Sequence, residues 1–552
     1  MRALLTAVFV VALAMAGAFH LSAAETIPVA ASTAAAGTIC PTCGESMSPT
    51  FNFCSNCGTN LEAFKGAATR MPDAGPADHA HADGPSGRSN TTIARPATAP
   101  KKSRFSDLFG HSSQGHGSAL SDKPIPLQLD NFPDRPKPII EWGQNPFLGV
   151  GPIAPGITLP TGATWQPSFI VFGTARAALQ TFDNGRGQIS ELVGRLDLFG
   201  NLYLTPTERI LIGFRPLDRD GLDYTGYRFD PDKKIHREIN AYITTFFVQG
   251  DFGELFPNLD PNDRGTFDIS FALGRQPLNF QDGIMINEDE IDAIGFSRPS
   301  NFFLGSSAWR TTALFAWNEL NRNNNRRESS AKLFGFFNTA DYETSTLDLD
   351  FAYVNAEADT GGDGLYAGVG ITRRFGLINS TTRINASLSL ETQTAAVSDG
   401  VLLFQQLSTT MPSSKDVAYL NAFWGINDYS SAARGEDRGG PLGAIGILFA
   451  AQGLGGYGAP LGNRANDAVG AALGYQMFLG SADRQIVFEF GGRVATQTPR
   501  FFAASQPDSI AAAARYQMKL NQHSVLIFDA FVGFPENRDT AYGLRSELLL
   551  KF

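Results

Sequence analysis

Four cysteines stand in two pairs near the amino terminus of the 552-residue sequence. The stretch CPTCGESMSPTFNFCSNCG has the spacing Cys-x2-Cys, ten residues, Cys-x2-Cys, and a glycine follows each pair. Each pair makes a tight turn that presents two thiolates, and four sulfurs complete a closed tetrahedral Zn²⁺ site. Such a site is structural, because four sulfur ligands leave no open coordination position. The candidate zinc ligands are Cys40, Cys43, Cys54 and Cys57.

Two disulfide bonds are the alternative use of these cysteines, because exported thiols normally meet oxidising conditions. The two-residue loop within a pair is strained for a structural disulfide, although bridges between the pairs avoid that strain. No histidine follows either second cysteine, which excludes covalent c-type haem attachment. The CPTCG and CSNCG knuckles resemble those of the zinc-ribbon family. The resemblance implies a small zinc-ribbon module over residues 37–62. Because so small a module has no room for a catalytic pocket, it is expected to bind a periplasmic or cell-wall partner or to anchor the tether.

The amino-terminal sequence MRALLTAVFVVALAMAGAFHLSAAE has the features of a secretory signal peptide. One arginine precedes an apolar run, and the small-residue exit SAA favours cleavage near Ala24, which would remove residues 1–24. A membrane anchor is the alternative, but the apolar run is marginal for a hydrocarbon core of about 30 Å. No later stretch offers roughly 18 uninterrupted apolar residues, so helices are not expected to span a membrane.

Between the cysteine pairs and the first predicted strand, the amino-acid composition distinguishes two segments, residues 63–125 and residues 126–165. Residues 63–125 are rich in Ala, Pro, Gly, Ser, Asp and His and lack the apolar surface that offsets ordering entropy, which predicts a disordered linker. Its His79 and His81 could add a weak metal site, although a solvated tether is the preferred interpretation. Residues 126–165 are rich in Pro and Gly and are expected to form an irregular lead-in. The net charge of −10 excludes a nucleic-acid binder, which needs a basic surface.

From residue 166 to 552, short segments of alternating apolar and polar residues follow one another with turn residues between them. In RLDLFGNLYL, TLDLDFAY and TTRINASLSLET the period is two, which indicates β-strands and not helices. We count about 16–18 candidate strands of the length that crosses an outer membrane. The predicted fold is therefore all-β: a transmembrane antiparallel up-and-down β-barrel. A soluble β-sandwich is the alternative, but aromatic residues near strand ends suit the interfacial girdles of a membrane barrel.

The last strand, AYGLRSELLLKF, carries apolar residues at alternate positions and ends on Phe552. Tyr542, Leu544, Leu548 and Leu550 share its predicted lipid-facing side. This pattern resembles the carboxy-terminal signature of Gram-negative outer-membrane β-barrel proteins. The resemblance implies a position in the cell outer membrane, contact with its lipid, and recognition of Phe552 by the barrel-assembly machinery. An even number of strands would put both barrel ends, and the amino-terminal module, in the periplasm.

The polar strand faces supply candidate lining residues for a lumen, which a barrel of this size makes wide enough for water. Isolated charges are too costly in hydrocarbon, so an ionised interior implies a wet lumen. Any one charge could instead pair with a neighbouring strand and brace the wall. The candidates are Arg195, Asp197, Arg275, Asp348, Asp350, Arg383, Arg493, Arg545 and Glu547. Because both signs are present, the set favours neither cations nor anions.

The stretch FALGRQPLNFQDGIMINEDEIDAIGFSRP resembles the alginate-export-type barrel family, in which Gly-Arg-Gln precedes a glycine-containing turn and an acidic stretch. The matching residues are Gly274, Arg275, Gln276, Asp282 and Gly283. The acidic cluster is a candidate constriction loop, a Ca²⁺ site or a solvated surface loop, although its spacing does not match an EF-hand. Its members are Glu288, Asp289, Glu290 and Asp292. NELNRNNNRRESS, from Asn318, is expected to be an exposed hairpin connection.

Enzymatic activity is not expected, because His236 and His523 are the only histidines in the barrel region and no Gly-x-Ser-x-Gly elbow occurs. The sequence predicts an outer-membrane porin or channel for passive diffusion of small hydrophilic solutes. One alternative is an alginate-export-like polysaccharide or substrate-specific transport barrel. Another is a plugged structural barrel that tethers the outer membrane to a periplasmic partner. A homo-oligomer is compatible with each of them.

Overall fold

The computed structural model describes two short pieces near the amino terminus and most of the chain after residue 136. The described residues are 38–39, 46–47, 137–143, 156–185, 187–219, 224–262, 264–358, 361–412, 414–436, 438–443, 446–450, 453–480, 483–498, 500–501 and 506–552. The predicted signal peptide and linker lie outside them, as does the zinc ribbon apart from β1 (Thr38–Ile39) and β2 (Ser46–Met47). The chain divides into two compact units, residues 1–101 and 102–552.

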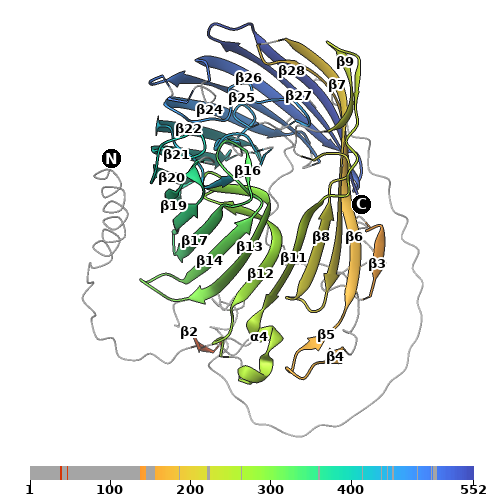
Figure 1. The fold of residues 1–552 in the computed structure, drawn as a ribbon, viewed down its shortest axis with the longest axis vertical. Helices are drawn as coiled ribbons and strands as arrows, with labels where there is room; N and C mark the ends of the chain where they lie inside the picture. Colours follow the sequence, from red (N-terminus) through yellow and green to blue (C-terminus); the bar gives the residue numbers. More distant parts are fainter. Residues whose placement is uncertain are drawn as a thin grey trace, which may run out of the picture. The chain divides into compact units, whose positions relative to one another are not determined.

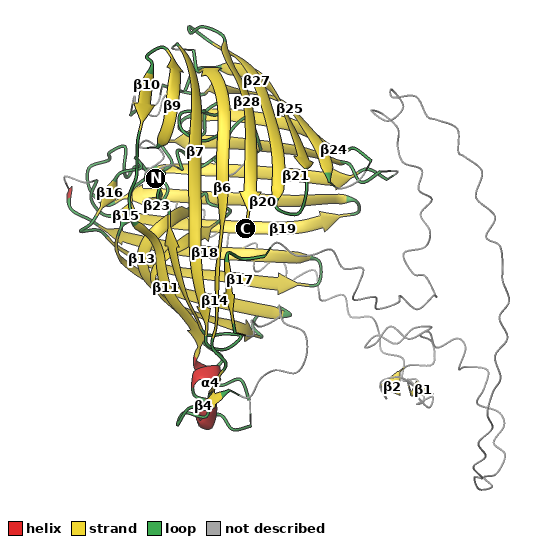
Figure 2. Ribbon diagram, turned by 90° about the vertical axis from the view of Figure 1, so that its right-hand side faces the viewer, coloured by secondary structure: helices red, strands yellow, loops and turns green. Residues whose placement is uncertain are grey.

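The second unit is a closed antiparallel β-barrel of eighteen strand positions (Figures 1 and 2). The strands are β6 (Ser168–Asp183), β7 (Gln188–Tyr203), β8 (Arg209–Phe214), β9 (Thr225–Asp230), β10 (Lys234–His236), β11 (Ile243–Asp251), β12 (Ser270–Phe280), β13 (Ile286–Asn301), β14 (Ala308–Asn318), β17 (Lys332–Tyr342), β18 (Ser345–Asn355), β19 (Gly364–Phe375), β20 (Ile378–Ser389), β21 (Gly400–Thr410), β22 (Val417–Asn427), β24 (Ala468–Phe478), β25 (Arg484–Ala495), β26 (Ser509–Lys519), β27 (Ser524–Pro535) and β28 (Ala541–Lys551). β8 and β9 both pair with β7 and share one position, and β11 and β10 pair with them to occupy the next. β28 pairs with β6 and closes the cylinder, which confirms the predicted fold class.

Several shorter elements accompany the barrel. They are β3 (Ile140–Trp142), β4 (Ile157–Thr158), β5 (Thr164–Trp165), α4 (Phe252–Leu255), η2 (Pro257–Leu259), β15 (Leu320–Asn321), β16 (Arg327–Glu328) and β23 (Ala433–Arg434). The lead-in, expected to be irregular, thus contains three short strands. β3 pairs with Phe169–Val171 of β6. The carboxy-terminal strand pairs with β6 only as far as Gly173, so the edge of β6 before that residue can accept β3. No helix among the described residues is both long and apolar enough to cross a membrane.

The alternation seen in the sequence separates an apolar outer face from a polar inner face. On β28, Leu544 is 58% exposed, whereas Arg545 and Glu547 are buried. Phe552 extends the closing ladder: its backbone exchanges hydrogen bonds with Gly173 of β6 (2.8 and 3.1 Å). Because side chains alternate across a strand, a one-residue shift would turn these charges toward lipid, so the closing register is strongly specified.

The two ends of the barrel differ. Most turns are short at the end where β6 begins and β28 finishes, as in the connections 343–344 and 376–377, although the connection 252–269, which holds α4 and η2, is longer. Connections at the opposite end include residues 319–331 and 428–467, and these fold into the barrel. Both barrel termini therefore lie at the short-turn end.

Residues 428–467, which we call the lumen segment, join β22 to β24, and those of them that the structure describes fill part of the interior. Their buried side chains, which include Phe449 and Tyr457, pack against Phe423 of β22 and Phe531 of β27. Small inward residues of the wall leave room for them: Ala468, Ala472, Ala511, Ala513 and Ala541. A dry cluster of this kind stabilises the inward position of the segment through apolar burial.

Two further connections enter the lumen. The β12–β13 turn crosses it, since Gln281 donates to Asp350 of β18 (2.7 Å) and Asp282 pairs with Arg383 of β20 (2.6 Å). The hairpin of β15 and β16 also folds inward. The expectation that it is exposed was wrong: Leu320 and Arg322 are buried, because the hairpin packs between the β12–β13 turn and the lumen segment.

Candidate functional site

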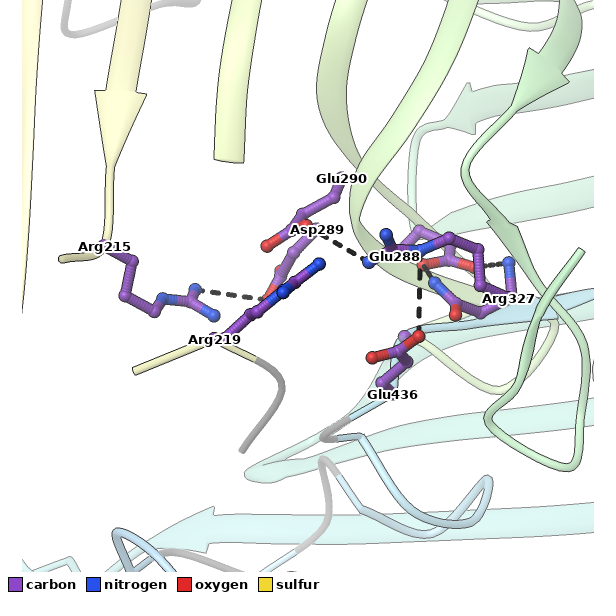
Figure 3. Close-up of a pocket in the computed structure, with 9 residues that line it drawn as sticks. Arg215, Arg219, Glu288, Asp289, Glu290, Arg327 and Glu436 are labelled. Atoms are coloured by element: carbon purple, nitrogen blue, oxygen red, sulfur yellow. Dashed lines mark hydrogen bonds and ion pairs between the residues drawn. The ribbon is translucent and has the colours of Figure 1, made fainter. Parts of the chain in front are cut away.

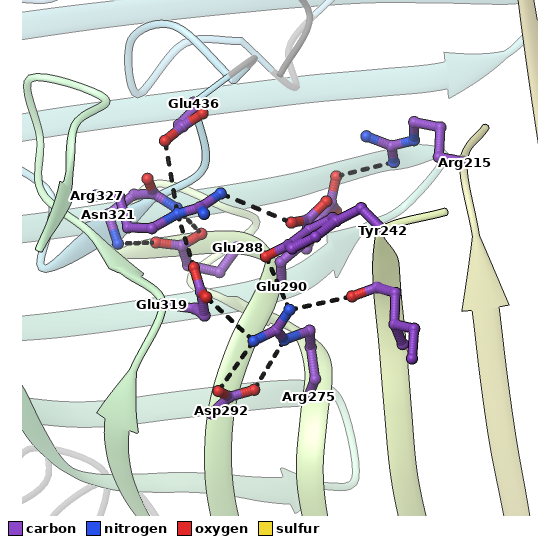
Figure 4. Close-up of polar contacts among 12 residues, drawn as sticks. Arg215, Tyr242, Arg275, Glu288, Glu290, Asp292, Glu319, Asn321, Arg327 and Glu436 are labelled. Carbon is purple, nitrogen blue, oxygen red and sulfur yellow. Dashed lines mark hydrogen bonds and ion pairs between the residues drawn. The ribbon is translucent and has the colours of Figure 1, made fainter. Parts of the chain in front are cut away.

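The acidic residues 288–292 lie in β13, where that strand bends from the barrel wall into the lumen, and not in a surface loop. The preceding turn reverses the chain tightly: Gln281, Asp282 and Gly283 all have positive φ. After the turn, Ile286 and Asn287 stay paired with Phe280 and Asn279 of β12, while their other side pairs in parallel with β23 of the lumen segment instead of with β14. The bend brings Asp289, Glu290 and Asp292 to arginines from other parts of the chain and Glu288 to Asn321, forming what we call the charged cluster (Figures 3 and 4).

Asp289 joins the wall to the lumen segment. Arg438 of the lumen segment hydrogen-bonds its carboxylate, and Arg215, just after β8, approaches to 3.7 Å. Glu288 is almost fully buried and accepts hydrogen bonds from the backbone N–H and the amide of Asn321 (2.8 and 3.1 Å). The cluster thus ties three separate segments of the chain to β13.

Arg327, from β16, is the centre of the cluster (Figure 4). Its guanidinium lies 2.7 Å from Glu319, 3.7 Å from Glu436 and 4.0 Å from Glu290. One arginine thus faces three carboxylates contributed by the β14–β17 connection, the lumen segment and β13. Shared pairing of this kind holds the three elements at fixed distances.

A cavity of about 20 Å³ lies among these side chains. It is lined by Arg215, Arg219, Glu288, Asp289, Glu290, Asn321, Arg327, Gly435 and Glu436 (Figure 3). A space of that size holds about one water molecule. The cluster therefore leaves little free space between its own side chains.

The chemistry of the cluster is that of paired charges and not of a cation cage. Its carboxylates accept hydrogen bonds from guanidinium and amide groups, which leaves few free oxygens for the six to eight ligands that Ca²⁺ takes. Among the described residues, no group of three or more His, Cys, Asp or Glu side chains is arranged to hold a metal ion.

The predicted lining residues have partners inside the barrel. The ion pairs are Arg195–Asp197 (3.1 Å), Arg275–Asp292 (2.9 Å), Arg383–Asp348 (3.0 Å) and Arg545–Glu547 (2.6 Å). Asp350 accepts from Gln281, and Arg493 donates to the backbone carbonyls of Leu461 and Arg464 in the lumen segment (3.1 and 2.9 Å). These charges brace the wall and hold the inward-folded segments.

Several residues of the charged cluster were missed by sequence reasoning. Arg215, Glu319, Arg327, Glu436 and Arg438 lie outside the alternating strands, in connections that carry no period. Only the inward folding of those connections brings them together. The sole signal in the sequence is the high charge of NELNRNNNRRESS, which is more typical of an exposed loop.

A fully buried arginine anchors the lumen segment near the cluster. Arg434 of β23 donates to the backbone carbonyl of Gly283 and, from Nε, to the Ser431 hydroxyl (3.2 Å). Burial lowers the pKa of the Arg434 guanidinium to about 9, so it remains protonated at neutral pH. It therefore links the lumen segment to the β12–β13 turn as a cation.

The two barrel histidines have structural contacts. His236 stacks on Tyr224 with ring centroids 5.2 Å apart. His523 lies in the turn between β26 and β27, where its Nδ1 is 3.0 Å from the carbonyl oxygen of Lys551.

A row of alternating charges crosses four adjacent strands on the inner wall. Arg515 pairs with Asp529 (2.5 Å), Asp529 with Arg545, Arg545 with Glu547 (2.6 Å), and Glu547 with Arg176 of β6 (2.6 Å). Asp529, Arg545 and Glu547 are almost completely buried. The row therefore stabilises the closing strands chiefly because each buried charge has a neighbour of opposite sign.

Replacing Asp529 with alanine is expected to destabilise the barrel by about 3–5 kcal/mol, because it leaves the buried Arg545 short of a partner. Asp483, which pairs with Lys519 at the exposed short-turn end, is the matched control, and Asp483→Asn should cost less than about 1 kcal/mol. Urea unfolding in lipid vesicles, followed by tryptophan fluorescence, measures both. Equal losses in the two variants would contradict a stabilising role for the row.

Comparisons with known proteins bear on both units. A family model described as a zinc-ribbon domain matches residues 39–61, and no curated protein matches the chain. Within the first unit, β1 and β2 pair antiparallel and lie on either side of Cys40 and Cys43 in the sequence.

The barrel is similar to solved structures whose sequences are identical to this chain at about 10% of the aligned residues. For OccK11 (OpdR) of Pseudomonas aeruginosa the identity is 10% and the TM-score 0.46, covering 70% of this chain and 96% of that one. For the P. aeruginosa outer membrane protein OpdK the values are 10% and 0.45, covering 69% and 98%. For Wzi, an outer membrane protein involved in group 1 capsule assembly in Escherichia coli and a carbohydrate-binding β-barrel, they are 10% and 0.43, covering 69% and 84%. The solved structures similar to this barrel thus include outer-membrane β-barrels.

Proposed function

We propose that the chain is an outer-membrane channel for passive diffusion of small hydrophilic solutes, with a zinc-ribbon module in the periplasm. The observation that carries the proposal is the charged cluster with its water-sized cavity, inside a closed cylinder whose outer face is apolar. Only a closed sheet leaves no backbone edge unpaired in lipid, and so many ionised groups inside it call for hydration or pairing.

The barrel topology supports the proposed orientation. Outer-membrane barrels have short periplasmic turns and longer external connections. Both barrel termini lie at the short-turn end here, so the chain that precedes the barrel would start from the periplasmic side. The amino-terminal module would then meet cell-wall material or a periplasmic protein, while Phe552 would serve the barrel-assembly machinery.

The zinc ribbon is proposed to hold one Zn²⁺ through Cys40, Cys43, Cys54 and Cys57. The family match covers all four residues, and the paired strands that flank the first knuckle in the sequence suit a ribbon. A thiolate-coordinated zinc of this type supplies folding energy and no catalysis.

The full-length protein is expected to carry about one zinc per chain, and the double variant Cys40→Ser/Cys57→Ser close to none, because two ligands cannot hold a structural site. Inductively coupled plasma mass spectrometry on protein washed with a weak chelator measures the content, with Ser55→Ala in the second knuckle as control. Protein without zinc whose four cysteines resist thiol reagents until reduced would favour disulfides instead.

A plugged structural barrel is the second candidate, and the lumen segment favours it. That segment contributes a dry apolar cluster to the interior and is tied to the wall by Arg434 and Arg493. Under this candidate the barrel anchors the periplasmic module to the membrane and passes no solute.

Swelling of liposomes that contain the full-length protein separates the two candidates. A channel is expected to admit a small neutral sugar such as arabinose and to exclude a larger one such as raffinose, because the charged cluster leaves little room. Liposomes that stay shrunken in every sugar, although the protein is folded, would favour the plugged barrel.

The alginate-export-like alternative predicted a constriction lined by arginines. In the charged cluster arginines alternate with carboxylates, and Arg275 itself pairs with Asp292 and Glu319. An alternating arrangement gives a polyanion no continuous run of free cations, so the geometry favours small solutes.

A further inference from the structure

One part of the wall is held by side chains instead of a backbone ladder. The β11–β12 ladder ends at the pair Phe246–Arg275, although β12 continues for five more residues toward the long-loop end. Beyond that point β12 pairs only with β13, and β13 has left β14 at Asp292. In the described residues no register pair joins β12 to β9 or β10. We call this interval the seam.

Two residues of β12 account for the seam. Gly274 has a φ of 124°, and a Cβ there would lie 2.3 Å from the carbonyl oxygen of Phe246, so only glycine fits the kink. Pro277 has no N–H to donate, and a β-bulge lies between Gln276 and Leu278. The strand therefore bends away from β11 immediately after Arg275, in the GRQP sequence.

The two sides of the seam differ sharply in polarity. On its outer rim, Ile235, Ile239 and Ile243 are 63%, 73% and 37% exposed. Ile235 lies opposite Tyr227, which lies opposite the exposed Leu192 of β7, so Ile235 shares the outer face of the wall. Just inside lies Tyr242, whose ring has the guanidinium groups of Arg219, Arg275 and Arg327 within 5.2–5.7 Å of its centroid. Three cations therefore surround the ring of Tyr242, the residue that directly precedes Ile243 of the apolar rim.

Arg275 crosses the seam (Figure 4). From β12 it donates to the Tyr242 hydroxyl (2.7 Å) and to the carbonyl oxygen of Ile243 (3.1 Å), while its other nitrogens hold Asp292 and Glu319 (2.9 and 3.1 Å). Hydrogen bonds from one side chain are easier to break than a ladder, so the seam can part without unfolding the barrel.

We propose that the seam is a lateral route between the lumen and the surrounding lipid, latched by Arg275, for single-chain amphipaths with an anionic head group. The hydrocarbon chain would lie along Ile235, Ile239 and Ile243, and the head group would compete with the neighbouring carboxylates for the guanidinium groups of Arg219 and Arg327 beside Tyr242. A wholly hydrophilic solute gains nothing from the apolar rim, and a wholly apolar one is excluded by the charges behind it. The proposal rests on the barrel being a channel.

Photolabelling tests the route on the full-length protein in nanodiscs of dimyristoylphosphatidylcholine. The probe is dodecanoate with a diazirine at the end of its chain, and labelled peptides are mapped by mass spectrometry. Label is expected to concentrate on residues 234–246 and 276–292, about tenfold above the equally lipid-facing residues 526–534 and 544–550. That ratio corresponds to roughly 1.4 kcal/mol of preference. Label spread evenly around the barrel would overturn the proposal.

Variants of the latch sharpen the test. Arg275→Gln should raise labelling of residues 286–292 about tenfold, since it removes the charge-assisted hydrogen bonds across the seam. Arg515→Gln, which removes an ion pair on the far wall, should leave the pattern unchanged. Pro277→Thr restores a donor to β12 and should lower the label by favouring a longer ladder. No response in either seam variant would overturn the role of Arg275.

Ion conductance separates this proposal from the channel itself. Even labelling in protein that still conducts would remove the lateral route and leave the channel standing. Protein that carries no current would remove the channel whatever the labelling pattern.

Discussion

Replacing residues 440–462 of the lumen segment with a short Gly/Ser linker is expected to raise the single-channel conductance about threefold or more. Those residues supply Leu448, Phe449, Tyr457 and Leu461 to the apolar cluster that occupies the interior. An eighteen-strand barrel without such a filling is wide enough for an aqueous channel. Planar-bilayer recording of the variant and the natural protein gives the comparison.

The variant should still form a barrel, because β22 and β24 pair directly over Val417–Gly425 and Ala468–Gln476 without the lumen segment. It also keeps Glu436, Arg438 and Arg464, which lie outside the replaced residues. Exchanging the exposed turn 537–540 for Gly/Ser of equal length is the matched control and should not change the conductance. Equal conductance in both variants would show that ions do not pass through the space that the segment fills.

Deletion of Phe552 is expected to reduce the amount of assembled barrel in the outer membrane about tenfold. Its backbone makes the last two hydrogen bonds of the β28–β6 ladder, with Gly173. Its ring also covers that glycine, since a Cβ on Gly173 would lie 2.9 Å from Cε2 of Phe552. The deletion thus removes the final contact of the closing ladder together with the residue proposed as the assembly signal.

Heat-modifiable migration of outer-membrane fractions on denaturing gels measures the assembled fraction. Phe534→Ala on β27 is the control, because Phe534 is 53% exposed, is aromatic and lies on the same lipid-facing surface away from the closing ladder. A loss of assembly as large in Phe534→Ala as in the deletion would attribute the effect to any lost aromatic contact with lipid, and not to the terminal position.

The barrel wall was predictable because its physics is local. On β28 every second side chain meets lipid, so Leu544, Leu548 and Leu550 could be assigned outward from their spacing alone, and they are exposed in the structure. The same alternation put Arg545 and Glu547 inside, where they are buried. The two-residue alternation of apolar and polar side chains, with turn residues between the segments, was sufficient to predict an all-β barrel.

The interior of the barrel was not predictable in the same way. The stretch GPLGAIGILFAAQGLGGYGAPLG of the lumen segment shows neither the two-residue period of a strand nor the 3.6-residue period of a helix. Its partners are small residues from several strands, which come together only when the cylinder closes. Arg327 and Glu436 likewise meet across more than a hundred residues of sequence. Such contacts depend on where connections fold, which local spacing does not specify.

The acidic residues show both outcomes. The charge of the run 288–292 makes Glu288 and Glu290 candidates for a constriction, and they do lie in the lumen. Their arginine partners could not be foreseen, so the sequence alone leaves the constriction, Ca²⁺ and surface-loop interpretations open. Only the bend in β13 places these residues in the lumen.

Current recording on the full-length protein in a planar lipid bilayer tests the central claim most directly. A channel that passes the charged cluster should give stepwise currents. These currents should be steady in time and should change sign with the applied voltage. A bilayer that stays impermeable after insertion of folded, heat-modifiable protein would contradict the account.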